Sequence, residues 1–280
     1  MGPATLASLI MSPVHCLFGL HIVRRGVIFI DLAVAQVAAL GMALAVSQGH
    51  EPQSMPAYWL SLSFALGAAL LIAVSKFRLG KVPHEAVIGI IFVVASAAGI
   101  VILENTPHGL EELKDIMAGS ILFVQTDHLK TTAMLYAGVL FFAIVLWRYF
   151  TAATLQSPDA PKGWKSVLVD FAFYGLLAFV VASSVKIAGV LVVFTWLVMP
   201  AVCAFFFVDK IKTATIVSLP IAVLASAGGL WVSYSRDWPT GAAIVVAFGA
   251  VVAGFYVVRL FIPNRAGSVE SMEGRPPPAS

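Results

Sequence analysis

Charged side chains are scarce in this chain of 280 residues. Only 11% of its residues are Asp, Glu, Lys or Arg and 60% are apolar, whereas a typical soluble domain is about 25% charged. A water-soluble fold of this length could not hide such an excess of apolar side chains, because surface falls too slowly with size. The composition therefore excludes an ordinary soluble domain and indicates a protein surrounded mainly by lipid.

Motifs for several common chemistries are also missing. The two cysteines, Cys16 and Cys203, form no Cys-x-x-Cys pair, so a zinc or thiol-redox motif is excluded and both are interpreted as small apolar side chains. The chain has no phosphate-binding Gly-x-x-x-x-Gly-Lys-Ser/Thr loop, since Gly80-Lys81 is followed by Val82 and lacks the upstream glycine. No basic patch interleaved with aromatics indicates a nucleic acid partner, and no nucleophile–base arrangement indicates an enzyme.

Long apolar runs are abundant instead. A membrane span needs about 20 mostly apolar residues. We expect about nine transmembrane segments, at residues 5–23, 27–46, 57–75, 86–103, 130–150, 166–184, 187–208, 212–234 and 241–261. Runs such as GIIFVVASAAGIVIL lack the alternation of barrel strands, so the predicted fold class is all-α, a polytopic membrane helix bundle. The first segment begins almost at Met1 and contains Pro13, which leaves room for a longer N-terminal helix outside this reading frame.

The basic residues of the loops predict an orientation. Lys and Arg accumulate on the cytoplasmic side of short loops. With the N-terminus outside and the C-terminus in the cytoplasm, all but four of the 17 Lys and Arg residues lie inside, the exceptions being Lys114, Lys130, Lys186 and Arg236. This orientation depends on the turn at 184–187. If the sixth and seventh segments were one bent span, every later loop would change sides.

Two stretches do not read as spans. Residues 104–128 are amphipathic and then apolar for too short a distance to cross, which predicts an outer-face helix followed by a short re-entrant piece. Residues 263–280 are rich in Pro, Ser and Gly and predict a disordered C-terminal tail. The predicted organisation is thus one membrane domain, residues 1–262, with the tail after it.

Polar residues inside the spans are candidate functional residues, because an ionisable group in the bilayer is costly. Asp31 and Gln36 lie five residues apart on the second segment, roughly 140° from each other around a helix. A structural and a functional interpretation stay open for each residue. Asp31 either meets the basic turn at Arg24 or interfacial water, or it lines a pathway; Gln36 either makes an interhelical hydrogen bond or supplies a pathway oxygen. The histidines, among them His15 and His21, form no His-x-x-x-His or Glu-x-x-His pair, and we assign them structural or solvated roles.

Five motifs carry a family resemblance. HIVRRGVIFI, HEAVIGIIFVVASAAGIVIL, MAGSILFVQTDHL, IAGVLVVFTWLVMPAVCA and WPTGAAIVV follow one another between about Gly19 and Val258. In this order and spacing they resemble the permease subunit of the bacterial zinc, manganese and iron ABC importers, the ABC-3 family. The resemblance implies alternating access in the inner (plasma) membrane, a second permease, cytoplasmic ABC ATPase subunits, an extracytoplasmic metal-binding protein, a helix break at Pro200 and no tightly bound cofactor besides the transported divalent metal.

The resemblance also assigns a loop and exposes a departure. The loop after the fifth span would contact the ATPase, which places Lys162, Gly163, Lys165 and Asp170 in the coupling loop. The family usually carries an Asp and, four residues later, a His in the second span, and aligned on Gly41 these positions hold Leu32 and Gln36. The metal site therefore stays unknown: the ion passes as a chelate or nearly hydrated, other residues supply ligands, or the cargo differs. The alternative function is a secondary transporter or channel for a small cation, although no convincing internal repeat accompanies it.

Overall fold

The computed structural model describes residues 2–51, 54–78, 82–104 and 126–262, and within these ranges the chain is helical with no strand. The predicted all-α fold class is confirmed. The helices are α1 (Gly2–Arg25), α2 (Ile30–Ser47), α3 (Met55–Arg78), α4 (His84–Glu104), α6 (Thr126–Val145), α7 (Trp147–Thr154), α8 (Trp164–Ala188), α9 (Val190–Phe205), α10 (Ile211–Arg236) and α11 (Thr240–Phe261). The predicted re-entrant piece and C-terminal tail fall mainly on residues 105–125 and 263–280, outside the described ranges, and both stay predictions.

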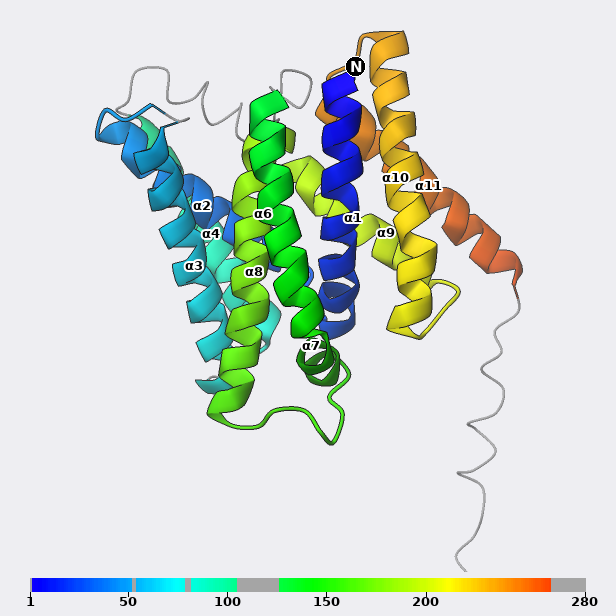
Figure 1. Ribbon diagram of the computed structural model, residues 1–280, viewed down its shortest axis with the longest axis horizontal. Helices are drawn as coiled ribbons and strands as arrows, with labels where there is room; N and C mark the ends of the chain where they lie inside the picture. The colour runs from blue at the N-terminus through cyan, green and yellow to red at the C-terminus, as the bar shows by residue number, and fades with distance from the viewer. Residues whose placement is uncertain (1, 52–53, 79–81, 105–125, 263–280) are drawn as a thin grey trace, which may run out of the picture.

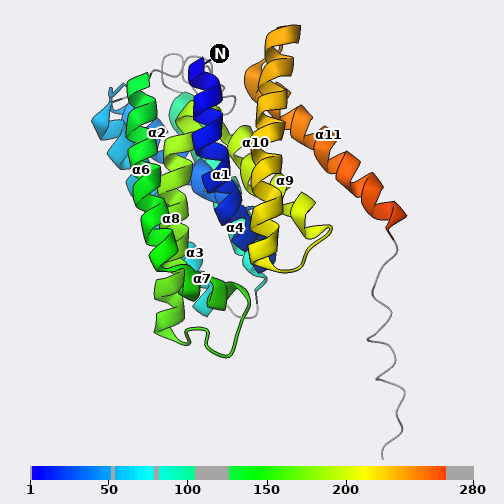
Figure 2. The same cartoon turned by 45° about the vertical axis from the view of Figure 1, so that its right-hand side comes forward.

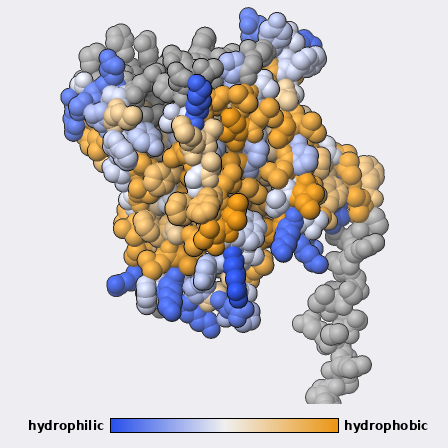
Figure 3. Space-filling model, viewed as in Figure 1, coloured by the Kyte–Doolittle hydropathy of each residue, from blue (hydrophilic) through white to orange (hydrophobic). Residues whose placement is uncertain are grey.

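An apolar belt surrounds the bundle. Figure 3 shows hydrophobic side chains over the middle of the molecule and hydrophilic ones toward its two ends. Large apolar side chains point outward within this belt, such as Ile216 and Leu224 on α10, which are 73% and 70% exposed. Backbone groups in lipid find no water, so helices that bond internally are the structure that such a belt requires.

The number of crossings differs from the predicted nine. Within the described ranges, seven helices are long and apolar enough to span a membrane, and an eighth span results if α6 and α7 are taken as one. Those two helices meet at an angle of 66° at Leu146, within the predicted fifth span. The predicted seventh span is the 16-residue α9, which at about 1.5 Å per residue is shorter than the hydrocarbon core. Neighbouring helices bury most of α9, so it does not have to present a full membrane-length surface to lipid.

The helix break in this part of the chain lies at Gly189, between α8 and α9, rather than at Pro200, where the sequence predicts it. α9 continues through Pro200 to Phe205, although a proline deprives the Trp196 carbonyl, four residues earlier, of its helical hydrogen bond. Gly189 separates α8 from α9 with φ 81° and ψ 159°, a conformation that side chains with a Cβ disfavour. α8 and α9 also run in different directions in Figures 1 and 2; α8 is long enough to span a membrane by itself, and α9 is a shorter apolar helix.

Helix α1 occupies the centre of the bundle. It packs against α9 and α10 on one side and against α6, α7 and α8 on the other, while α2, α3, α4 and α8 form a second packed group (Figure 1). Glycine permits the closest of these approaches: a Cβ on Gly19 of α1 would lie 1.7 Å from the Leu197 carbonyl oxygen of α9. Small residues at such positions let membrane helices pack backbone against backbone.

Candidate functional site

Basic side chains gather at one end of the bundle, which we call the basic end. It comprises the last turns of α1 and α3, with Arg24, Arg25, Lys76 and Arg78, and the connection between α7 and α8. The α1–α2 turn and the start of α4 also lie there, because Glu85 accepts a hydrogen bond from the Ile28 amide. This is the end that the distribution of Lys and Arg predicts to face the cytoplasm.

A buried carboxylate organises the basic end. The two oxygens of Asp170, on α8, each accept from one cation: Oδ1 from Arg25 Nη1 and Oδ2 from Lys76 Nζ, both at 2.7 Å. The side chains of Asp170 and Arg25 are 2% and 4% exposed, whereas that of Lys76 is 42% exposed. One carboxylate therefore ties α1, α3 and α8 together in a region that water hardly reaches.

The guanidinium of Arg25 makes further contacts. Its Nε donates to Thr154 Oγ1 at 2.9 Å, Nη2 donates to the Phe150 carbonyl at 3.4 Å, and its Cζ lies 4.3 Å from the centre of the Phe173 ring. The Thr154 hydroxyl donates to the Phe150 carbonyl at 2.7 Å, so its oxygen is left to accept from Arg25 and from His21 Nδ1, which lies 2.9 Å away. We call Arg25, Lys76, Thr154 and Asp170 the Arg25 cluster.

The Arg25 cluster borders the predicted coupling loop. Residues 155–163 connect α7 to α8, and Lys162, Gly163 and Lys165 are exposed beside the start of α8. Asp170, assigned to the loop with them, lies instead in the second turn of α8, because that helix begins at Trp164 directly after Gly163. The fourth residue of the predicted set is thus a buried ion-pair partner rather than an exposed loop residue.

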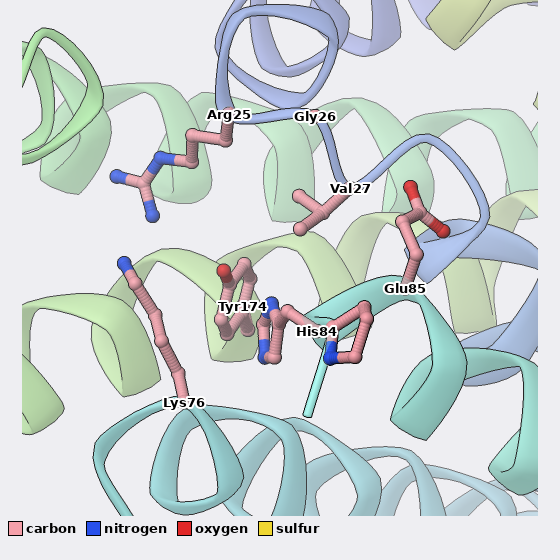
Figure 4. Close-up of a pocket in the computed structure, with 8 residues that line it drawn as sticks. Arg25, Gly26, Val27, Lys76, His84, Glu85 and Tyr174 are labelled. Atoms are coloured by element: carbon pink, nitrogen blue, oxygen red, sulfur yellow. The ribbon is translucent and has the colours of Figure 1, made fainter. Parts of the chain in front are cut away.

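A cavity of about 330 Å³ opens beside the cluster. Figure 4 shows Arg25 and Lys76 extending toward one another on one side of it, Tyr174 and His84 between, and Glu85 on the far side. His84 Nε2 lies 3.0 Å from the Ile72 carbonyl and Glu85 Oε1 lies 2.5 Å from the Ile28 amide, so both side chains anchor backbone at the cavity wall. The remaining lining residues are Gly26, Val27 and Pro83.

Asp31 and Gln36, the predicted pathway residues, are both buried on α2, 2% and 6% exposed. Arg24 does not reach Asp31: its guanidinium lies 3.8 Å from the Asp209 carboxylate, donates to the Asp209 carbonyl and covers the Phe205 ring. Asp31 Oδ1 is buried without a hydrogen-bond partner in the described part of the chain. The pathway role of Asp31 and Gln36 stays a prediction, and both positions offer oxygen donors.

A second polar cluster lies within the bundle, away from the basic end. His15 Nδ1 lies 2.7 Å from the Met11 carbonyl, which can only accept, so Nδ1 carries the ring proton. His15 Nε2 then accepts from the Ser184 hydroxyl at 2.8 Å, and Tyr136 donates to Ser184 Oγ at 2.6 Å. This His15 cluster (His15, Tyr136 and Ser184) is fully buried and links α1, α6 and α8 without any formal charge.

No three His, Cys, Asp or Glu side chains gather at metal-binding distance in the ranges that the structure describes. The polar residues that the structure adds to the predictions are mainly Arg25, Lys76, Thr154 and Ser184. The sequence carried one signal for the two cations, Arg25 and Lys76: Asp170 lies in an apolar segment, where a carboxylate requires a positively charged partner. The sequence offers many basic residues at that end and does not say which of them reach the carboxylate.

Comparisons with known proteins agree with the helical bundle. The model of the ABC 3 transport family matches residues 1–261. A "Probable iron transport system membrane protein" of Haemophilus influenzae is 27% identical over 227 residues, 79% of each chain. The manganese transport system membrane protein MntC of Halalkalibacterium halodurans is 25% identical, over 76% of each chain. Among solved structures, PsaBC from Streptococcus pneumoniae in complex with Fab shares the fold with a TM-score of 0.74 and 20% identity, covering 97% of this chain and 94% of that one.

Proposed function

The chain belongs to the ABC 3 transport family, and on that premise we propose that it is the permease subunit of an ATP-driven importer for a divalent transition-metal ion. The observation that carries the proposal is the family match over residues 1–261, which takes in every described helix. Relatives are named for iron and for manganese transport, which supports a metal cargo.

The energy source lies on other chains in this proposal. No phosphate-binding loop occurs in the sequence, so cytoplasmic ABC ATPase subunits hydrolyse the ATP. The 155–163 loop meets them at the basic end, which faces the cytoplasm, and the N-terminus of α1 faces outward. An extracytoplasmic metal-binding protein delivers the ion, and a second permease completes the pore in the bacterial inner membrane.

The donors on α2 favour manganese over zinc, and the relative named for iron transport makes iron a second candidate. Imidazole suits zinc, whereas carboxylate and carbonyl oxygens suit manganese. Leu32 and Gln36 stand where the family usually has Asp and His, so the buried donors on α2 are the oxygens of Asp31 and Gln36. Because these two side chains do not share a face of the helix, they contact a passing ion in succession rather than together, and the ion keeps part of its hydration shell or a chelator.

Uptake of radiolabelled manganese, iron and zinc tests the proposal, in cells that express this chain with its candidate ATPase and binding protein. ATP-dependent accumulation of manganese or iron ahead of zinc is the expected result, and a variant ATPase without its phosphate-binding lysine should abolish it. Driven uptake by this chain alone in liposomes would contradict the ABC mechanism. A complex that assembles and hydrolyses ATP without accumulating any of the three metals would show that the cargo is different.

A further inference from the structure

One side chain meets both ends of the 155–163 loop. Thr154, the last residue of α7, directly precedes the loop and accepts from Arg25 Nε. Asp170 follows the loop in the second turn of α8 and accepts from Arg25 Nη1. The guanidinium therefore spans the base of the loop, while the loop's own Lys162 and Gly163 are exposed.

Arg25 also belongs to the turn that leads into α2. It is the last residue of α1, Gly26 follows with φ 65°, and α2 begins at Ile30. The Glu85 carboxylate holds this turn from α4 by accepting the Ile28 amide at 2.5 Å. The guanidinium thus connects the base of the loop to a short turn, and that turn leads into the helix that carries Asp31 and Gln36.

The chemistry of the site requires arginine rather than a positive charge alone. The Nε, Nη1 and Nη2 atoms donate in three directions from one plane, to Thr154, Asp170 and the Phe150 carbonyl. A lysine carries one compact ammonium group and cannot hold partners on both sides of the loop base in this fixed geometry. Lys76 illustrates the difference, because its ammonium group donates to one oxygen of Asp170, Oδ2, from one side of the carboxylate.

We propose that Arg25 is a positioning residue that couples the ATPase-contacting loop to α2 by bracing Thr154 and Asp170 against the α1–α2 turn. This inference rests on the proposed function, since it takes the 155–163 loop as the ATPase contact. It adds the residue through which a movement of that loop reaches the predicted pathway.

The test replaces Arg25 by Lys or Gln in the complete complex, reconstituted in liposomes, and measures metal ions transported per ATP hydrolysed. Arg25→Lys keeps the ion pair with Asp170 and loses the brace, so we expect the ratio to fall about tenfold, the scale set by one charge-assisted hydrogen bond. Arg25→Gln should lower it at least as far. A merely structural role would reduce the amount of assembled complex and leave this ratio unchanged.

Arg24 supplies the matched control. It lies one residue earlier on α1, its guanidinium contacts the exposed Asp209 and the Phe205 ring, and its variants Arg24→Lys and Arg24→Gln should keep the wild-type ratio. A wild-type ratio in Arg25→Lys would overturn the inference and leave the importer intact. A wild-type complex that shows no ATP-driven uptake would overturn the proposed function itself, and the inference with it.

Hydrogen–deuterium exchange of the purified chain in detergent gives a readout that does not depend on transport. We expect amides of residues 155–163 and of the α1–α2 turn, 26–29, to exchange faster in Arg25→Lys than in wild type, while α10 stays unchanged. Faster exchange of the loop alone, with an unchanged turn, would contradict a brace that joins the two segments.

Discussion

The two polar clusters of this bundle are built on opposite principles. The His15 cluster joins α1, α6 and α8 through hydrogen bonds between neutral groups. The Arg25 cluster joins α1, α3, α7 and α8 around a buried carboxylate with two cations, one of which is 42% exposed. Both connect residues more than ninety positions apart in the sequence, and both begin from α1.

The difference follows the cost of charge in a membrane. A charged side chain in the centre of the bilayer is expensive, so helices in that region associate through neutral hydrogen bonds and close packing. In the Arg25 cluster, Lys76 is 42% exposed while Arg25 and Asp170 are almost fully buried, so a strong and directional ion pair forms where one of its two cations is still accessible. We therefore expect the His15 cluster to determine stability alone and the Arg25 cluster to determine both stability and coupling.

Removing the central carboxylate should have the largest effect. Asp170→Asn leaves the buried guanidinium of Arg25 without its counter-charge, and we expect the free energy of unfolding to fall by about 3–5 kcal/mol. Unfolding of the purified chain by SDS in mixed micelles measures this. Asp159→Asn makes the same change on an exposed residue of the adjacent loop and should be neutral; equal losses in the two variants would contradict the buried pair.

The α1 segment between the two clusters is the next most sensitive position. Gly19→Ala would place a methyl group against the Leu197 backbone, and separating α1 from α9 should cost about 3 kcal/mol. A Cβ on Gly67 of α3 would meet no atom within 4 Å, so Gly67→Ala should be neutral or stabilise the protein by about 0.5–1 kcal/mol. A similar melting temperature for both variants would show that α1 and α9 do not pack backbone to backbone.

A substitution of Gly163, which ends the 155–163 loop, tests whether backbone strain at this loop lowers coupling. Gly163 has φ 60° and ψ −139°, so Gly163→Val should cost about 1–3 kcal/mol and lower transport per ATP without unfolding the bundle. Gly49, with φ 86°, lies after α2 at the opposite end of the bundle, and Gly49→Val should impose similar strain but leave transport per ATP unchanged. Normal coupled transport in Gly163→Val would count against the assigned loop.

Within the His15 cluster, the Ser184 hydroxyl contacts three groups: Tyr136, His15 and the Val180 carbonyl of its own helix. Ser184→Ala removes the acceptor of Tyr136 and the donor to His15, and we expect a loss of about 1 kcal/mol with unchanged transport per ATP. Ser96 of α4 donates to the Phe92 carbonyl of its own helix and links no two helices in the described part of the chain, so Ser96→Ala should change stability less. A fall in transport per ATP in Ser184→Ala would break the proposed division between the two clusters.

The smallest effect on stability is expected at Gln36. Gln36→Ala should change the free energy of unfolding by less than about 1 kcal/mol. It should raise the KM for metal uptake by up to about tenfold, because one oxygen donor is lost. Gln48, exposed at the other end of α2, provides the control variant Gln48→Ala. Unchanged uptake kinetics in Gln36→Ala would assign Gln36 to helix packing.

Much of the fold was predictable because lipid leaves few alternatives. Each of the nine predicted apolar segments has a helical counterpart among the described residues. Seven of these helices are long enough to cross a membrane, or eight crossings result if α6 and α7 form one span. The bend at Leu146 and the short α9 depend on which neighbours cover those segments, and apolar composition does not reveal neighbours. The break at Gly189 rather than at Pro200 also depends on neighbours. Pro200 is buried among other helices, and in such a setting a helix can continue past a proline although one hydrogen bond is missing.

By itself, the sequence determined that this chain is helical, that lipid surrounds it and where its basic residues concentrate, because these properties depend on composition along the chain. Only the tertiary structure decided that Arg25 rather than Arg24 holds Asp170, and that Thr154 and Lys76 join them. Adjacent helical residues point about 100° apart, so a single turn of α1 sends one arginine to the surface and the next into the bundle. Which partner each arginine meets there depends on the packing of α3, α7 and α8 around that turn.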